Sequence, residues 1–375
     1  MKPKKIHWGT IFYIGGYHLF LAIALPLFFL AQLPSAALII TMSVLVFVSG
    51  IAVTAGYHRL YSHLTYKTNP FVEAVLLFFA SLAQEGSALR WAHDHRLHHA
   101  FVDTDRDPYS IKKGFWYAHV WWLFYKSDEI DKKIISDLYR NKLLVFQHNH
   151  YLACMIGSNV LVFLLCGWIF QDYWASFLFI WWLRTFCLHH TTWFINSLAH
   201  TWGEQAYSRE HSAVDNYLIC LLTYGEGYHN YHHTFANDYR NGIRWYHFDP
   251  TKWLIWTLHK LGLAKDLKTV NDYRIQKQLI TDHKNLLVEQ VKGSFFVHKE
   301  KIENILTELN EALVSKLGTI QELIEKYKTL GKQERSKLVA DIKEAKKSFK
   351  QSWKEWKVVV RSVEKGNGDK LVACK

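Results

Sequence analysis

The 375-residue sequence has few cysteines and few prolines, and it lacks the short motifs of several kinds of cofactor site. Its five cysteines form no C-x-x-C pair, so the sequence predicts neither a disulfide framework nor a rubredoxin-like or ferredoxin-like iron–sulfur site. A His-Pro-Gly-Gly haem motif is absent as well. No RNA- or DNA-binding motif accompanies the net charge of +12, so we expect no nucleic acid partner.

Charged residues are nearly missing from four long apolar stretches and gather elsewhere along the chain. Each stretch has about the 20 residues that a helix needs to cross a bilayer core of roughly 30 Å. Three contain no Asp, Glu, Lys or Arg, and the fourth contains only Arg184, which we expect to face the protein interior or to reach toward the interface. The sequence therefore predicts four transmembrane helices, over residues 10–31, 36–58, 151–171 and 173–199.

The positive charges predict which ends of these helices face the cytoplasm. The turns near residues 32–35 and 171–172 hold no Lys or Arg, whereas the N-terminus, residues 59–150 and everything after His200 are basic. Because cytoplasmic segments of membrane proteins carry the excess of Lys and Arg, we expect these three parts on the cytoplasmic side of a multi-pass protein. The apolar segment 71–83 is too short to cross and predicts a helix at the membrane interface or under a cytoplasmic cap.

Nine of the 22 histidines form a pattern that is typical of a metal site. Two clusters place histidines at positions i, i+3 and i+4, which lie on one face of a helix. The third cluster is a pair of histidines five positions apart, which can face the same site if the second transmembrane helix ends at the first of the pair. A single histidine lies at the end of the fourth helix. The nine are His58, His63, His95, His98, His99, His200, His229, His232 and His233.

Nine neutral imidazoles exceed what one ion needs, and they suit two transition-metal ions with four or five nitrogens each. Zinc is the main competitor, but its sites usually stop at four ligands. Soluble di-iron proteins pair two Glu-x-x-His motifs, and here Glu226 and His229 supply that spacing once. A membrane protein that binds or transports zinc is the alternative from another class, and such a protein should place its ionisable residues near mid-membrane.

The segments around these histidines resemble one family. They are TAGYHRLYSH (54–63), WAHDHRLHH (91–99), NSLAH (196–200) and GEGYHNYHHTF (225–235), and they are similar to the integral-membrane acyl desaturases of the stearoyl-CoA Δ9 type. The likeness covers roughly residues 11–270. It implies an all-α fold in which four transmembrane helices lie under a cytoplasmic helical cap that holds two irons.

The same resemblance implies roles for single residues. One iron would be bound by His58, His63, His95, His99 and His233. The other would be bound by His98, His200, His229 and His232, and Asn196 would hold a water on it. Lys112 and Lys113 stand where the family has a basic pair that binds the phosphates of the acyl carrier.

The reaction that the resemblance implies converts a saturated acyl chain, O2 and two electrons into a cis-monounsaturated chain and water. Acyl-CoA is the expected substrate, but His93 stands where animal relatives have an arginine near coenzyme A, so another carrier or a lipid-bound chain stays open. An acyl-lipid desaturase or a membrane di-iron hydroxylase shares the histidines and is the nearest alternative. Because no haem or iron–sulfur motif is present, we expect a separate electron donor, a ferredoxin or cytochrome b5 with its reductase.

The bound acyl chain must run its methyl end back between the membrane helices. Thr54, Ile51 and Phe47 share a helical face with His58, and Phe47 lies deepest, about 16 Å from His58 along the axis. That is the length scale of the carbons beyond the new double bond. We therefore predict that Phe47 closes the substrate tunnel.

The last hundred or so residues differ from the rest of the chain. Residues 1–265 are predicted to form the membrane domain with its cap, and residues 266–375 a basic helical tail. Apolar residues recur every three or four positions over 302–327 and again over 338–356, with a break near Gly331. Two amphipathic helices, folded against each other or onto the cap, would bury both apolar stripes.

Overall fold

The computed structural model describes residues 5–373, and the regular structure in that range is helical apart from isolated bridges and one two-stranded sheet. The sheet pairs β1 (Lys67–Thr68) antiparallel with β2 (Ala264–Lys265). The predicted all-α fold class is thereby confirmed. The prediction that the N-terminus is cytoplasmic also involves residues 1–4, which lie outside the described range.

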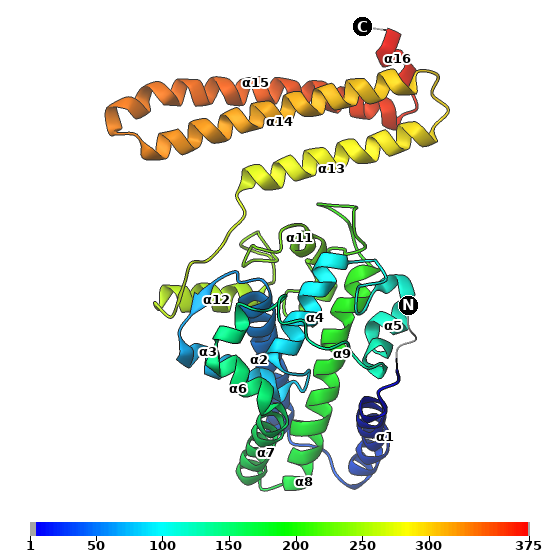
Figure 1. Ribbon diagram of the computed structural model, residues 1–375, viewed down its shortest axis with the longest axis vertical. Helices are drawn as coiled ribbons and strands as arrows, with labels where there is room; N and C mark the ends of the chain where they lie inside the picture. Colours follow the sequence, from blue (N-terminus) through cyan, green and yellow to red (C-terminus); the bar gives the residue numbers. More distant parts are fainter. Residues whose placement is uncertain (1–4, 374–375) are drawn as a thin grey trace. The chain divides into compact units, whose positions relative to one another are not determined.

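The chain divides into two compact units. The first unit holds the residues up to Ala206 together with Glu210–Thr269. The second unit holds Tyr207–Arg209 and the residues from Val270 onward. Figure 1 shows the elements of both units along the chain.

Three helices in the described part of the chain are long and apolar enough to cross a membrane. The fourth predicted segment is also helical from end to end, but it is not among these three helices. The number of membrane spans therefore stays a prediction. The three helices are α1 (Trp8–Ala31), α2 (Ala36–Ala52) with its continuation η1 (Val53–Ser62), and α7 (Tyr151–Phe170), and the fourth segment comprises α8 (Tyr173–Ala175), η5 (Ser176–Leu183), α9 (Arg184–Ser197) and η6 (Leu198–His200).

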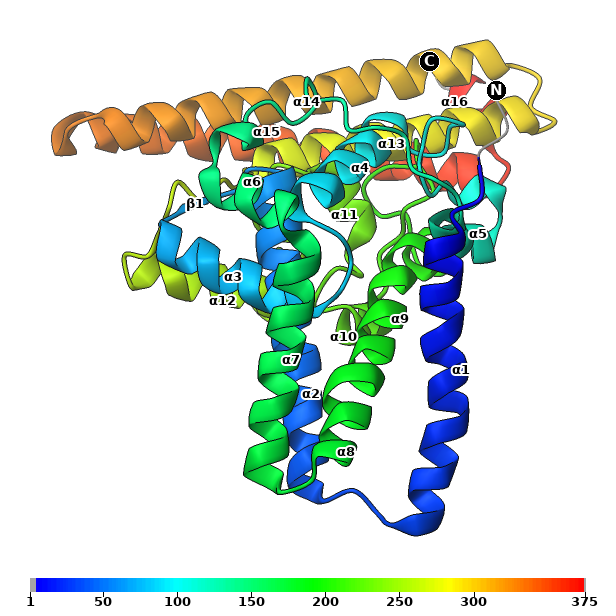
Figure 2. The same ribbon diagram turned by 60° about the horizontal axis from the view of Figure 1, so that its bottom comes forward.

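The turns of the two predicted helical hairpins lie together at one end of the first unit, away from α11 (Figure 2). Ser35 caps α2 by accepting a hydrogen bond from the Leu38 amide, and Asp172 caps α8 by accepting one from the Ala175 amide. The Gln32 side-chain amide also donates to the Asp172 carboxylate at 3.1 Å. This bond joins turns that are 140 residues apart in the chain.

Arg184 faces the protein interior, as predicted, with a side chain that is 1 % exposed. Its guanidinium donates to the carbonyls of Ile180 (2.6 Å) and Leu82 (2.9 Å) and to the Asn159 side chain. A charge removed from water needs such partners, and here neutral oxygens supply them.

The second membrane helix continues beyond His58, where the sequence led us to expect its end. From Val53 to Ser62 it is a π-helix, in which each amide bonds to the carbonyl five residues back. The His63 amide accordingly donates to the His58 carbonyl at 3.1 Å. Because of this wider turn, two histidines five positions apart share one face, and their ring centroids lie 4.9 Å apart.

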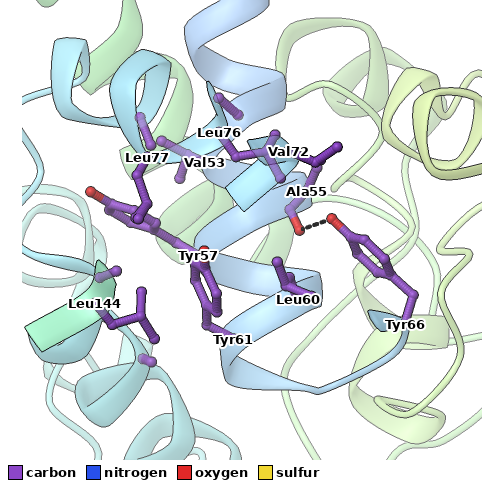
Figure 3. Close-up of a cluster of buried hydrophobic side chains, with 14 of the residues drawn as sticks. Val53, Ala55, Tyr57, Leu60, Tyr61, Tyr66, Val72, Leu76, Leu77 and Leu144 are labelled. Carbon is purple, nitrogen blue, oxygen red and sulfur yellow. Dashed lines mark hydrogen bonds between the residues drawn. The ribbon is translucent and has the colours of Figure 1, made fainter. Parts of the chain in front are cut away.

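The π-helix is held in the main apolar core of the first unit (Figure 3). Tyr57 and Leu60 of this helix belong to the same buried cluster as Leu76 of α3 (Pro70–Leu82). The Tyr66 hydroxyl donates to the Ala55 carbonyl at 3.0 Å, which ties the chain after the helix back onto it. Helix α3 matches the helix predicted over residues 71–83, and its place at a membrane interface stays a prediction.

Short helices and loops make up the rest of the first unit and carry most of the histidines. Helix α4 begins after Ser87, whose hydroxyl accepts a hydrogen bond from the Arg90 amide. The elements are α4 (Ala88–Phe101), η2 (Ile111–Lys113), α5 (Phe115–His119), η3 (Trp121–Phe124), η4 (Leu138–Arg140), α6 (Lys142–Asn149), α10 (Tyr217–Leu222), α11 (His229–Thr234) and α12 (Pro250–Lys260).

The second unit contains the two amphipathic helices that the sequence predicts, and they pack against each other (Figure 1). A further long helix, which was not predicted from the sequence, packs beside them. All three share a core that includes Leu287, Leu306 and Trp356. The helices are α13 (Asp272–Gly293), α14 (Lys299–Thr329), α15 (Lys332–Glu364) and the short α16 (Gly368–Ala373).

Candidate metal centre

The nine predicted histidines converge as two groups of ring nitrogens in the first unit. Within each group, one nitrogen from every ring lies within 4.8 Å of the others, which is close enough for a single metal ion. The first group contains His58, His63, His95, His99 and His232, and the second contains His98, His200, His229 and His233.

Two histidines exchange places relative to the expected division. The resemblance assigned His233 to the first iron and His232 to the second. In the structure His232 Nε2 lies 2.9 Å from His58 Nε2 and 3.0 Å from His99 Nε2, both in the first group. His233 Nε2 instead lies 3.2 Å from His98 Nε2. Consecutive residues on α11 point about 100° apart, so the two must face different groups, but the spacing alone does not say which.

The histidines present Nε2 to the centre, and several are held from behind through Nδ1. His58 Nδ1 lies 2.9 Å from a Glu226 carboxylate oxygen and His98 Nδ1 lies 2.9 Å from an Asp107 carboxylate oxygen. His200 Nδ1 lies 2.7 Å from the Ser212 hydroxyl. A ligating histidine usually makes such a bond with its other nitrogen, which sets its tautomer and orientation.

The spacing of the nitrogens fits bound metal. Six Nε2–Nε2 separations within the two groups lie between 2.9 and 3.2 Å. Two ligands that are each about 2.1 Å from one metal ion, at right angles to each other, would be about 3.0 Å apart. The donor set is therefore compatible with two metal ions of high coordination number.

Seven of the histidines at this centre are held in the neutral form that metal binding requires. Burial, followed by the repulsion from neighbouring histidines, lowers their pKa values well below the usual range. This holds for His63, His95, His99, His200, His229, His232 and His233.

A buried charge cluster lies directly behind the first group. Arg59 donates to Glu226 at 2.8 Å and pairs with Asp249 at 2.9 Å, and all three side chains are at most 1 % exposed. Burial alone would raise the pKa of Glu226, but the neighbouring His58 and Arg59 lower it to about 2. Glu226 and His229 have the spacing of a ligand pair in soluble di-iron proteins, but the structure places Glu226 as the acceptor that orients His58.

A cavity of about 670 Å³ reaches both histidine groups. Its wall includes His95 of the first group, His229 of the second, and the predicted site residue Asn196. Trp91 also lines it and stacks on the His95 ring at 4.8 Å between centroids. The wall extends from there to residues of α1, α4, α7 and α9.

One acid in the cavity wall was missed by sequence reasoning. Glu85 lies in the loop between α3 and α4, and its Oε1 atom is buried without a hydrogen-bond partner. Burial raises the pKa of Glu85 to about 7, although hydrogen bonds from Thr192 and Trp91 lower it in part. No local motif marks this residue, because its setting comes from helices distant in the sequence.

Three predicted substrate-binding residues lie outside the described wall of this cavity. Phe47 is 40 % exposed, and its ring lies 6.0 Å from that of Tyr224. Lys112 and Lys113 are the last two residues of η2, and both are exposed. Their roles stay predictions.

His93, at the position where animal relatives have an arginine, does not face solvent. It is 2 % exposed, its Nδ1 lies 2.8 Å from an Asp94 carboxylate oxygen, and its Nε2 accepts from the Asp131 amide at 3.1 Å. Both ring nitrogens are thus engaged within the protein. His93 cannot contact a carrier's phosphates in this arrangement.

These observations define a class of protein: a helical protein with membrane-length helices, in which a cavity leads to two histidine groups, each suited to one metal ion. Comparison with known sequences gives the family. A family model described as fatty acid desaturase matches residues 32–264. The chain belongs to the fatty acid desaturase family.

The relatives include proteins named for two kinds of substrate. The chain is 42 % identical over 242 residues to the probable acyl-CoA desaturase of Schizosaccharomyces pombe, covering 64 % of this chain and 50 % of that protein. It is 34 % identical over 274 residues to the sn-2 palmitoyl-lipid 9-desaturase of Nostoc sp., covering 70 % and 91 %. It is 33 % identical over 283 residues to the acyl-CoA desaturase of Ovis aries, covering 72 % and 77 %. The chain thus spans about half the length of its yeast relative.

Proposed function

We propose that this protein desaturates a saturated fatty acyl chain in an O2-dependent reaction and produces a cis-monounsaturated chain and water. The observation that carries the proposal is the cavity whose wall contains histidines from both metal-binding groups. An acyl chain in this cavity would lie against the ligands of both metals. Membership of the desaturase family supports the same reaction.

We propose two irons as the resident metals. His58, His63, His95, His99 and His232 would hold one, and His98, His200, His229 and His233 the other. Five nitrogens in the first group exceed the usual four of zinc. Iron, when bound, would supply the activation of O2, and Asn196, which lines the same cavity, would hold a water on the iron of the four-histidine group.

The protein's own residues orient the metal ligands and exclude water from the substrate. Glu226 and Asp107 orient His58 and His98 through their Nδ1 atoms. Trp91 stacks on His95 and closes the cavity wall beside the first group. Enclosing the acyl chain in this way excludes bulk water from the reacting carbons.

We propose acyl-CoA as the substrate and the Δ9 position for the double bond. The names of the fungal and animal relatives support this choice, and the exposed Lys112 and Lys113 would meet a carrier's phosphates, Lys113 after releasing the Asp105 carbonyl to which it donates at 3.3 Å. An acyl-lipid substrate is the second candidate, because the Nostoc relative is named for one. Because both ring nitrogens of His93 are bonded within the protein, this residue favours neither acyl-CoA nor an acyl-lipid as the substrate.

Electrons would come from a separate ferredoxin or cytochrome b5 with its reductase, delivered on the cytoplasmic side. With O2 and substrate alone the purified protein should make no product, and adding the carrier and reductase should start turnover. Repeated turnover with NAD(P)H and no added carrier would contradict this part of the proposal.

The proposed function is tested by the fatty acids of cells that express the protein, with double bonds located by mass spectrometry. A new Δ9 cis-monounsaturated chain, together with about two iron equivalents in the purified protein, is expected. A hydroxylated chain would identify a hydroxylase instead. An unchanged fatty acid profile with tightly bound zinc would favour the zinc-binding or transport alternative.

A further inference from the structure

Seven cations form one continuous stripe along α15 in the second unit. Their spacing of three or four residues keeps them within about 100° of the helix circumference. The stripe is about 27 Å long at 1.5 Å per residue. All seven side chains are exposed, and they are Lys343, Lys346, Lys347, Lys350, Lys354, Lys357 and Arg361.

The stripe is not neutralised by the protein itself. Among the residues that the structure describes, none of the seven forms an ion pair with an acid. One of them, Lys357, lies over the Trp353 ring at 5.8 Å. Like charges this close repel one another, so a row without counter-charges is stabilised by any extended anionic surface.

The opposite face of α15 is already buried. Trp356 is 1 % exposed, and Val360 and Val363 are 7 % and 5 % exposed in the core shared with α13 and α14. The helix therefore has no free apolar face to insert into a membrane or into a partner's groove. Any binding by this surface must depend on charge.

We infer that the α15 stripe binds the anionic lipid headgroups of the membrane in which the first unit is embedded. The tail follows directly on a unit with membrane-length helices, so a membrane surface is always within reach. Clusters of four to eight Lys or Arg on a helix suit phosphatidylserine or phosphoinositide surfaces.

The composition of the stripe favours lipid over an acidic protein. Six of the seven cations are lysines, whereas protein interfaces are depleted in Lys and built around buried apolar anchors. The large apolar side chains exposed on the described part of α15 are those of Val339 and Val358, and both are small for an interface anchor. A row of charged side chains without a buried apolar anchor suits lipid headgroups, which diffuse in the plane of the membrane.

Lysine footprinting of the full-length protein in lipid nanodiscs tests the inference. A neutral acylating reagent is applied in discs of phosphatidylcholine alone and in discs with about one third phosphatidylserine, and modified lysines are counted by mass spectrometry. At about 20 mM salt we expect the stripe lysines to react at least about five-fold more slowly in the anionic discs, and at about 500 mM salt to recover, because screening then acts within roughly 4 Å. Lys277, Lys301 and Lys326, exposed elsewhere in the second unit, should react equally in both discs.

Matched variants separate position from net charge. K346Q/K350Q/K354Q should abolish the protection of Lys343, Lys347 and Lys357, whereas K277Q/K301Q/K326Q, with the same net charge, should leave it intact. Equal reactivity in both kinds of disc would overturn the inference. So would protection that persists at high salt, or protection that requires an added acidic electron carrier in place of anionic lipid.

Discussion

Replacing Glu226 by Gln tests the claim that a buried carboxylate, itself outside the two ligand groups, controls the metal centre. Glu226 accepts from His58 Nδ1 at 2.9 Å, from Arg59 at 2.8 Å and from the Asn241 side chain at 2.7 Å. Gln has nearly the same shape but carries no charge. The change therefore removes the electrostatic contribution while keeping the packing.

The size of the effect follows from two independent arguments. A pKa that falls from 4.5 to about 2 means that the folded protein favours the charged carboxylate by ~3 kcal/mol. Removing one partner from a buried charge pair costs about 3–5 kcal/mol. We therefore expect E226Q to lower the free energy of unfolding of the first unit by about 3 kcal/mol. Loss of the negative charge on the acceptor behind His58 should also weaken metal binding about 10–100-fold.

The pH dependence gives a sign that can be checked. Because the pKa of Glu226 is lower in the folded protein, its contribution to stability is present above about pH 4.5 and is lost as the pH falls toward 2. The stability difference between the parent and E226Q should shrink over that range.

The assays are the unfolding midpoint in detergent and the iron content after titration with a competing chelator. The control is Asp137→Asn, which breaks a partly exposed pair with Arg96 at 2.7 Å and should cost less than about 1 kcal/mol without changing iron content. Equal stability and iron affinity of E226Q and D137N would refute the role assigned to the buried cluster.

Four further variants test the site. His98→Ala and His232→Ala should each remove one of about two iron equivalents and abolish product formation with membrane insertion intact; full activity of either variant would contradict the ligand assignment. Glu85, with a pKa of about 7, places a negative charge in the cavity as the pH rises through that value, so desaturase activity should fall over that range. Glu85→Gln should flatten the dependence of activity on pH. The same pH dependence in the variant and the parent would remove Glu85 from the substrate path. Phe47→Ala should admit longer acyl chains with the double bond at the same distance from the carboxyl end, and an unchanged chain-length profile at normal iron content would exclude Phe47 as the stop.

The sequence by itself determined the features that repeat locally. Apolar runs of bilayer length, the three-to-four spacing in the tail and the nine histidines could be recognised because each depends on neighbours along one helix. Family resemblance added the chemistry that such histidines serve.

Only the tertiary structure decided the features that depend on contacts between distant segments. The π-helix that aligns His58 with His63, the exchange of His232 and His233 between the two groups, and the use of Glu226 as an orienting acceptor all arise where helices meet. Local spacing defines the faces of a helix but not which face meets which neighbour, because that choice depends on how all the side chains in the core pack together.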